Sequence, residues 1–301
     1  MVNRPKKDLV EIFGYAPDDM TDSARALWRL EACPFTQSAC TKFNHDKTIA
    51  YGTCSVTSPF GDCIICPNRL YENNYWALKQ VAIDAFGPDI NFTTYGDYIP
   101  RRNDGEKYII ALGMSSGKEV KLSRKLSMDW VLAEVENGNL NRYVGIEVQS
   151  IDITGNYRDA WHTYKNLPIR NVDAVPKSEH GLNWANVHKR LIPQLIRKGV
   201  VYSNSKLVPS GLYFIVPEVV YKKFEEIIGE DIPLVEYQAP DVMTVYTYSL
   251  SKPVPHGQQR HIVETRKLRF LISEFSERFI TGASLPSGEE LDNAVKRVLG
   301  I

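Results

Sequence analysis

The sequence YVGIEVQS, residues 143–150, predicts a β-strand. Alternation of side chains places Ile146 and Val148 on one face of this strand. Glu147 and Gln149 lie on the other face, which carries an acid and an amide two residues apart without a basic partner. Such a face is either the solvated side of an ordinary hairpin, because Glu and Gln are common surface residues, or part of a site.

A second strand is predicted upstream, where Asp129 precedes the apolar run WVLA at 130–133. Between the two strands lies Asn137-Gly138, a strong signal for a tight hairpin turn. Strands that fold back about this turn pair residues whose numbers sum to about 275–278, and 129 plus 147 gives 276. We therefore expect the carboxylates of Asp129 and Glu147 to meet, as binding of a divalent metal requires.

An acid on one strand and Glu-x-Gln on the next resemble the core of the PD-(D/E)XK nucleases. Gln149 stands where that family usually has Lys. Short motifs of this kind also occur by chance, so the rest of the chain has to support the interpretation.

Whole-chain values are those of an ordinary globular protein, with 301 residues, 43% hydrophobic and 24% charged. This length allows one large domain or two smaller ones. No run of about eighteen apolar residues is present, and no apolar segment follows the basic N-terminus, so we expect neither a membrane span nor a signal peptide. The formal net charge of zero argues against indiscriminate coating of DNA but allows a basic cleft.

All five cysteines lie between residues 33 and 66, at Cys33, Cys40, Cys54, Cys63 and Cys66. In a cytosolic chain this clustering favours a metal over disulfides, since four thiolates make a closed tetrahedral site. Spacing alone does not identify the spare cysteine, and a chance cluster of buried or redox-active cysteines is the alternative. Because turn residues are frequent here, we predict a segment that lacks a hydrophobic core and folds around its metal.

Two groups of motifs together resemble the NotI-type restriction endonucleases, over most of the chain. The N-terminal group is Cys33-Pro34-Phe35-Thr36, Cys40-Thr41-Lys42, Cys54-Ser55-Val56 and Ile65-Cys66-Pro67-Asn68-Arg69. The second group is Ile146–Asp152 followed by Thr154–Arg158, which is similar to the active-site strand of that family. The chain is shorter than NotI itself, and its size would suit a relative with a shorter GC-rich palindrome.

The resemblance implies an α/β fold, a PD-(D/E)XK core with a mixed central sheet flanked by helices. Residues 1–70 would form a four-cysteine metal-binding module, and residues 71–301 the endonuclease domain with its DNA-recognition elements. The structural metal, iron or zinc, is assigned to Cys33, Cys40, Cys54 and Cys66, which leaves Cys63 spare. In the endonuclease domain, Asp129 and Glu147 would hold Mg²⁺, and Gln149 would orient water or a phosphate oxygen.

Other segments offer further candidates. Residues 113–118 do not match a P-loop, which has four residues between its glycines and Ser or Thr after Lys. The following Glu119 is either a third acid near the metal or an exposed side chain. Residues 71–86 and 107–112 are expected to form a helix and a strand, and helices are expected at 265–279 and 288–299.

Basic residues concentrate between Arg158 and Lys206, where nine Lys or Arg face three acids. Within this region Lys189 and Arg190 lie off a helical apolar stripe and either contact phosphates or form a solvated helix face. In the polar loop 253–261, Gln258 and Arg260 are able to read bases, although a plain surface loop fits equally well.

The resemblance and these residues together predict a bacterial, cytoplasmic type II restriction endonuclease. It would cut double-stranded DNA at a GC-rich palindrome with Mg²⁺, as a homodimer matched to the two-fold symmetry of its site. Two alternatives stay open. A repair or transposition nuclease of the same fold would keep both acids without cutting at a fixed sequence. A non-enzymatic, metal-containing DNA-binding protein would not depend on Glu147.

Overall fold

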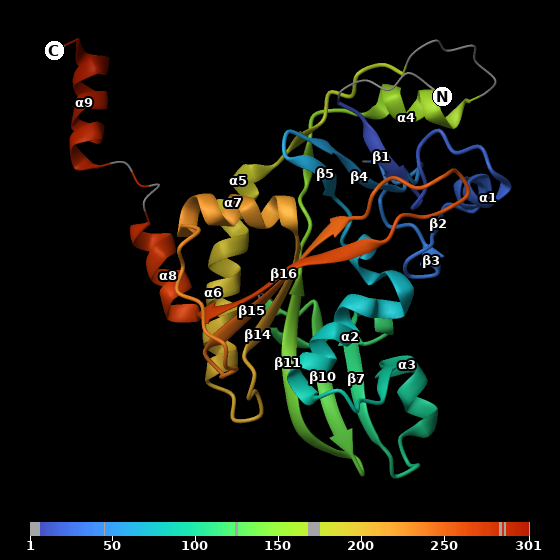
Figure 1. The fold of residues 1–301 in the computed structure, drawn as a ribbon, viewed down its shortest axis with the longest axis vertical. Coiled ribbons are helices and arrows are strands. Elements are labelled where there is room, and N and C mark those ends of the chain that lie inside the picture. Colours follow the sequence, from blue (N-terminus) through green and yellow to red (C-terminus); the bar gives the residue numbers. More distant parts are fainter. Residues whose placement is uncertain are drawn as a thin grey trace.

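A computed structural model describes residues 7–44, 46–123, 126–167, 175–282, 285 and 287–300. Its centre is a seven-stranded mixed sheet in the order β16-β15-β14-β11-β10-β7-β6 (Figure 1). The strands in this order are Ile262–Leu271, Val242–Leu250, Leu212–Pro217, Asn139–Val148, Trp130–Glu136, Lys107–Gly113 and Phe92–Thr94. The predicted α/β fold with a mixed central sheet flanked by helices is confirmed.

The hairpin of β10 and β11 has the register that the Asn-Gly turn predicts. The two strands are antiparallel, with Trp130 opposite Ile146 and Val131 opposite Gly145. Asn137-Gly138 has positive φ angles of 51° and 75°, as the two-residue turn that suits twisted strands requires. Each of these pairs sums to 276, so the pairing of β10 and β11 is confirmed.

Helix α2 (Glu72–Phe86) covers one face of the sheet. Its buried residues Leu78 and Val81 pack in one cluster with Leu132 and Ile146 of the hairpin. The predicted helix at 71–86 and the predicted apolar face of β11 are therefore confirmed.

The opposite face is covered by α6 (Ile192–Ser203), α7 (Glu218–Ile228) and α8 (Ile272–Thr281) (Figure 1). Residues such as Leu195 of α6 and Phe214 of β14 belong to a second buried cluster. Glu147 therefore points toward the helices of this side, because it alternates with Ile146 along β11.

The N-terminal part is built on a three-stranded sheet of β1 (Leu9–Ile12), β4 (Thr53–Ser58) and β5 (Gly61–Ile64). Its buried Val56 lies in the same cluster as Trp161 of helix α4 (Arg158–Lys165). The prediction that the cysteine segment lacks a hydrophobic core is wrong, because its apolar side chains share the core of the main domain.

One predicted helix is also wrong. Residues 265–279 were expected to be helical throughout, but β16 continues to Leu271 and α8 follows it. Pairing with β15 along the whole strand outweighs the helix propensity of the charged residues. Phe270 is buried in the core, and Arg266 binds Glu225 at 2.6 Å, so both kinds of side chain favour the strand.

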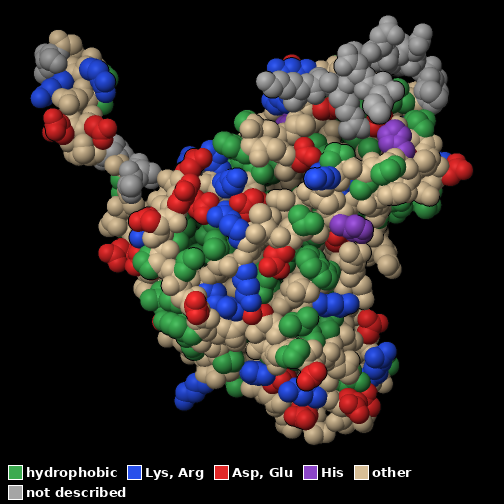
Figure 2. All heavy atoms as spheres, in the orientation of Figure 1, with side chains coloured by type: hydrophobic (Ala, Val, Ile, Leu, Met, Phe, Trp, Pro, Cys, Tyr) green, Lys and Arg blue, Asp and Glu red, His purple; other side chains and the backbone are tan. Residues whose placement is uncertain are grey.

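The remaining elements are α1 (Asp22–Leu30), β2 (Ala32–Cys33), β3 (Ser38–Ala39), η1 (Pro67–Tyr71), α3 (Tyr95–Tyr98), η2 (Ile99–Arg101), η3 (Met114–Ser116), β8 (Lys121–Ser123), β9 (Leu126–Ser127), β12 (Ile153–Thr154), α4 (Arg158–Lys165), β13 (Gly181–Leu182), α5 (Trp184–Asn186), η4 (Val187–Leu191) and α9 (Gly288–Leu299). Figure 2 shows acidic and basic side chains interspersed over one face, in keeping with the net charge of zero. Among the described residues, no helix combines the length and apolar character that crossing a membrane would need.

Candidate active site

Asp129 and Glu147 meet at the end of the hairpin opposite its turn. Asp129 directly precedes β10, and its Oδ2 accepts a hydrogen bond of 3.0 Å from the backbone N–H of Val148. This contact joins the start of one strand to the end of the other. Glu147 is only 6% exposed, whereas Asp129 is exposed. The predicted meeting of the two acids is therefore present, with one carboxylate buried and the other open to solvent.

Lys198, which belongs to the basic region of the sequence, completes this cluster. Lys198 of α6 forms a buried ion pair with Glu147, in which its Nζ donates to Oε2. The lysine is 8% exposed. A signal for it exists in the sequence, because Leu191, Leu195, Lys198 and Tyr202 recur at helical spacing. A charged residue on such a buried stripe requires a partner.

Helix α6 reaches the strand closely because residue 145 is glycine. A Cβ atom on Gly145 would lie 1.9 Å from the Tyr202 hydroxyl oxygen, so any other residue would push the helix away. Gly145 and Glu147 share one face of β11, and Tyr202 lies one helical turn beyond Lys198. The glycine therefore sets the spacing at which Lys198 contacts Glu147.

The carboxyl group of Glu147 is held in an unusual electrostatic state. Burial, together with the nearby charge of Asp129, raises its pKa from the ordinary value of 4.5 to about 8, and Lys198 opposes this rise. Oε2 binds Lys198, whereas Oε1 is buried without a hydrogen-bond partner among the described residues. A buried oxygen in this condition is costly unless a ligand satisfies it.

These residues suit a hard divalent cation such as Mg²⁺. Glu147 Oε1 and the carboxylate of Asp129 would be its protein ligands, because both are oxygen donors and Oε1 has no other partner. Mg²⁺ is commonly bound through one or two carboxylates, with water and substrate phosphate completing its shell. No cluster of three or more His, Cys, Asp or Glu able to hold a metal occurs in the described part of the chain, so two protein ligands are the number this site offers.

We predict that Mg²⁺ binding strengthens as pH rises through the titration of Glu147. The folded protein keeps this proton up to about pH 8, whereas the unfolded chain loses it near 4.5. This group's contribution to the free energy of unfolding is therefore full below pH 4.5 and is lost as pH rises toward 8. Mg²⁺ needs the carboxylate, so its apparent affinity should rise roughly tenfold per pH unit over this range.

Thermal unfolding with and without Mg²⁺ at about pH 6 and pH 8 measures this effect. The stabilisation by Mg²⁺ should be larger at the higher pH and should lose this dependence in Glu147→Gln. Equal stabilisation at both pH values would contradict the prediction.

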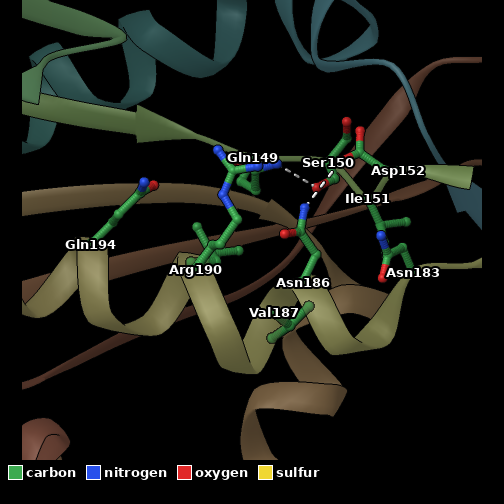
Figure 3. A pocket seen from close by; sticks show the side chains of 10 residues that line it. Gln149, Ser150, Ile151, Asp152, Asn183, Asn186, Val187, Arg190 and Gln194 are labelled. Atoms are coloured by element: carbon green, nitrogen blue, oxygen red, sulfur yellow. Dashed lines mark hydrogen bonds between the residues drawn. The ribbon is translucent and has the colours of Figure 1, made fainter. Parts of the chain in front are cut away.

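Gln149 lies two residues beyond Glu147, in a neighbouring polar pocket. Its side-chain Nε2 donates to the backbone carbonyl of Ser150 at 2.8 Å. The pocket is also lined by Arg190 and Gln194, and Figure 3 shows Arg190 extending from its helix toward Gln149. Asn186 closes one side through a 3.0 Å hydrogen bond from its Nδ2 to Asp152 (Figure 3). Gln149 and Arg190, predicted separately, therefore line one pocket.

The other predicted residues lie elsewhere. Glu119 forms an ion pair of 3.1 Å with Lys121. The charges that change the pKa of Glu147 are those of Asp129 and Lys198. Lys189 and Gln258 are exposed. Arg260 is engaged by Asp62 at 2.7 Å and by the Ser251 carbonyl. Arg170 of the basic region lies outside the described residues.

The electrostatic surroundings of Cys63 differ from those of the other buried cysteines. Burial raises the pKa of Cys40 and of Cys54, and raises that of Cys66 to about 11. At each of these sites the charge of another thiol in the set, Cys33 among them, adds to the effect. Burial raises the pKa of Cys63 to about 12, helped by Asp62 rather than by another cysteine. The described residues contain no complete metal-binding group, so the four-cysteine centre stays a prediction.

Comparison with known proteins does not assign the chain to a family. Models of protein families give no match, and a search of curated proteins gives none either. Its function is therefore inferred from the fold and from the cluster of Asp129, Glu147 and Lys198.

Proposed function

We propose that this protein is a Mg²⁺-dependent type II restriction endonuclease of the NotI kind, which hydrolyses phosphodiester bonds of duplex DNA at a GC-rich palindrome. The observation that carries this proposal is Glu147, with one oxygen on Lys198 and the other buried, unsatisfied and beside Asp129. Most buried polar atoms in folded proteins have a hydrogen-bond partner, so a carboxylate oxygen buried without one favours a ligand at this position. Here the unsatisfied oxygen lies beside a second carboxylate, as a metal site requires.

When bound, Mg²⁺ supplies a water of lowered pKa and neutralises charge that builds on the phosphate. Lys198 has two tasks in this arrangement. It fixes the rotamer of Glu147 by binding Oε2, so that Oε1 is directed away from it. It also provides, from a helix, the positive charge that PD-(D/E)XK nucleases usually carry at the position of Gln149. Gln149 is no general base, because an amide does not titrate near neutral pH.

DNA binding is supported by the surroundings of the site. Arg190 lies in the pocket next to Gln149, and Lys189 is exposed beside it. Both belong to the basic region of a chain whose net charge is zero, a composition that favours contact with phosphates. A palindromic target calls for a two-fold symmetric homodimer, which would place one hairpin on each strand of DNA.

We also propose that Cys33, Cys40, Cys54 and Cys66 hold iron or zinc in a structural role. A closed four-thiolate site has no open position for catalysis. Elemental analysis of the purified protein should therefore find one such metal per chain. Cys54→Ser should lose the metal and unfold at lower temperature, whereas Cys63→Ala should retain it. Loss of the metal in Cys63→Ala with retention in Cys54→Ser would overturn the ligand assignment.

Digestion of GC-rich plasmid DNA tests the proposed function directly. Discrete fragments that require Mg²⁺ and disappear in Asp129→Asn would support a site-specific nuclease, and their ends would give the recognition sequence. A smear that depends on the same residue would instead indicate a nuclease of repair or transposition. Tight binding without cleavage of any unmethylated DNA would leave a metal-containing DNA-binding protein.

A further inference from the structure

Helix α2 begins with a left-handed turn built from three residues that are not glycine. Asn73, Asn74 and Tyr75 have φ and ψ angles of 51° and 47°, 55° and 57°, and 62° and 38°. L-residues enter this region singly, and Asn does so more readily than most, but three in succession are rare. Strained backbone of this kind persists only where the surroundings enforce it, and it is concentrated at functional sites.

Both ends of this turn are fixed. On one side Glu72 is buried, forms an ion pair with Arg69, and accepts a 2.9 Å hydrogen bond from the backbone N–H of Ile262. On the other side the ring of Tyr75 lies 5.3 Å from that of Trp130, measured between centroids. Buried contacts therefore hold both ends of a turn whose two central residues, Asn73 and Asn74, point outward.

Those central residues have little to bind within the protein. Asn73 and Asn74 are exposed, and the side chain of Asn74 forms no hydrogen bond with the described part of the chain. Asn73 has only a long contact of 3.5 Å, from its Nδ2 to Glu72. The strain thus presents two amide side chains to solvent without any evident gain in stability.

The amides face a polar hollow of about 440 Å³ that five separate segments line. Its other lining groups include Gln37 between β2 and β3, Asp97 of α3, and Gln259 before β16. Figure 1 shows α2 below β2, β3 and the loop joining β15 to β16. The hollow lies at the end of the sheet where β10 begins, near Asp129, because Trp130, which contacts Tyr75, is the residue after Asp129; it is on the face covered by α2, opposite the face that carries Glu147.

The charges of this hollow favour base edges over phosphate. The lining residue Arg260 is already held by Asp62, while Asp97 adds an exposed negative charge that would repel phosphate. Amide groups offer one donor and one acceptor side by side, as base edges in the major groove require. A carboxylate such as Asp97 can accept from the amino group of cytosine.

We infer that this hollow reads base edges of duplex DNA, with Asn73 and Asn74 as specificity-determining residues. This inference rests on the proposed nuclease function. The left-handed turn then has a purpose, since it holds both amides rigidly in a geometry that a regular helix cannot offer. Rigid presentation reduces the entropy lost when the amides bind DNA.

The test compares cleavage rates on the mapped site with rates on duplexes that each carry one substituted base pair. Asn73→Ala and Asn74→Ala should lower the preference for the intact site at one or two positions by roughly tenfold to a hundredfold. Asn103→Ala is the matched control, since Asn103 is an exposed asparagine near the hairpin turn at the far end of the sheet, and its preference should not change.

Asn73→Gly/Asn74→Gly separates base contact by the amide side chains from the backbone conformation of the turn, because glycine adopts the left-handed turn without strain. This variant should unfold at a higher temperature than wild type and still lose the preference. A double-glycine variant with wild-type preference would overturn the inference, since only the turn would then matter. If the wild-type protein cleaves no DNA, the proposed function is refuted. If it cleaves DNA at a specific site but all variants keep the wild-type preference, only the base-reading inference is refuted.

Discussion

Glu147→Gln is expected to reduce Mg²⁺-dependent DNA cleavage at least about a thousandfold. The amide cannot carry the charge that Mg²⁺ needs, and the loss removes the buried ligand of a site with two carboxylates. Cleavage should be measured in single turnover at saturating DNA, so that the chemical step is followed rather than product release. Glu136→Gln is the control on the same hairpin, because Glu136 is exposed near the turn.

This substitution also affects folding, and the two effects can be separated. Above about pH 8, where Glu147 is ionised, Glu147→Gln leaves the ammonium of Lys198 buried without its carboxylate, which should cost about 3–5 kcal/mol in the free energy of unfolding. Adding Lys198→Met removes the stranded charge and should recover most of that loss. Cleavage should stay absent in the double variant. Cleavage within tenfold of wild type in folded Glu147→Gln would refute the metal site.

Lys198→Met alone is expected to lower cleavage by roughly a hundredfold to a thousandfold. The change frees Glu147 to leave its rotamer, and in the proposed mechanism it removes the positive charge that would lie close to the phosphate. Because Lys198 opposes the rise in the pKa of Glu147, its loss should raise that pKa further and shift the pH–rate profile to more alkaline values. Lys222→Met, at an exposed position outside the basic region, should behave as wild type.

Gln149→Lys offers a test by rescue. In the background of Lys198→Met, it restores an ammonium group to the strand, where PD-(D/E)XK nucleases usually carry it, and should recover part of the lost rate. If Lys198→Met cleaves normally with an unshifted pH profile, the lysine is only a structural partner of Glu147. If Lys198→Met folds and is inactive, and adding Gln149→Lys restores no cleavage, the positive charge must come from the helix.

The parts of this structure that local chemistry determines could be predicted from the sequence. Asn137-Gly138 sets the turn, the turn sets the register, and the register brings Asp129 to Glu147. Strand alternation gave the buried face of β11 for the same reason, because it depends only on neighbours along the chain. Each of these steps involves residues within about twenty positions of one another.

Features that depend on distant partners were missed. Lys198 lies 51 residues from Glu147, and only the packing of α6 against Gly145 shows that they form a pair. Residues 265–271 have the charged composition of an exposed helix, yet β15 supplies the hydrogen bonds that make them a strand. The pair Asn73-Asn74 is compatible with a left-handed start to α2, but the contacts that fix it are distant: Glu72 pairs with Arg69 and accepts a hydrogen bond from the backbone N–H of Ile262 in β16.

The ion-pair network around Arg69 has a consequence for protein engineering. Arg69 is fully buried, binds Glu11 of β1 at 3.0 Å and the carbonyl of Arg260 at 2.6 Å, and pairs with Glu72 at the start of α2. Each of these groups would become an unsatisfied buried charge or dipole if its partners came from another protein. The cysteine segment therefore cannot be exchanged alone between related proteins. A stable chimera would have to inherit β1, the start of α2 and the β15–β16 loop together.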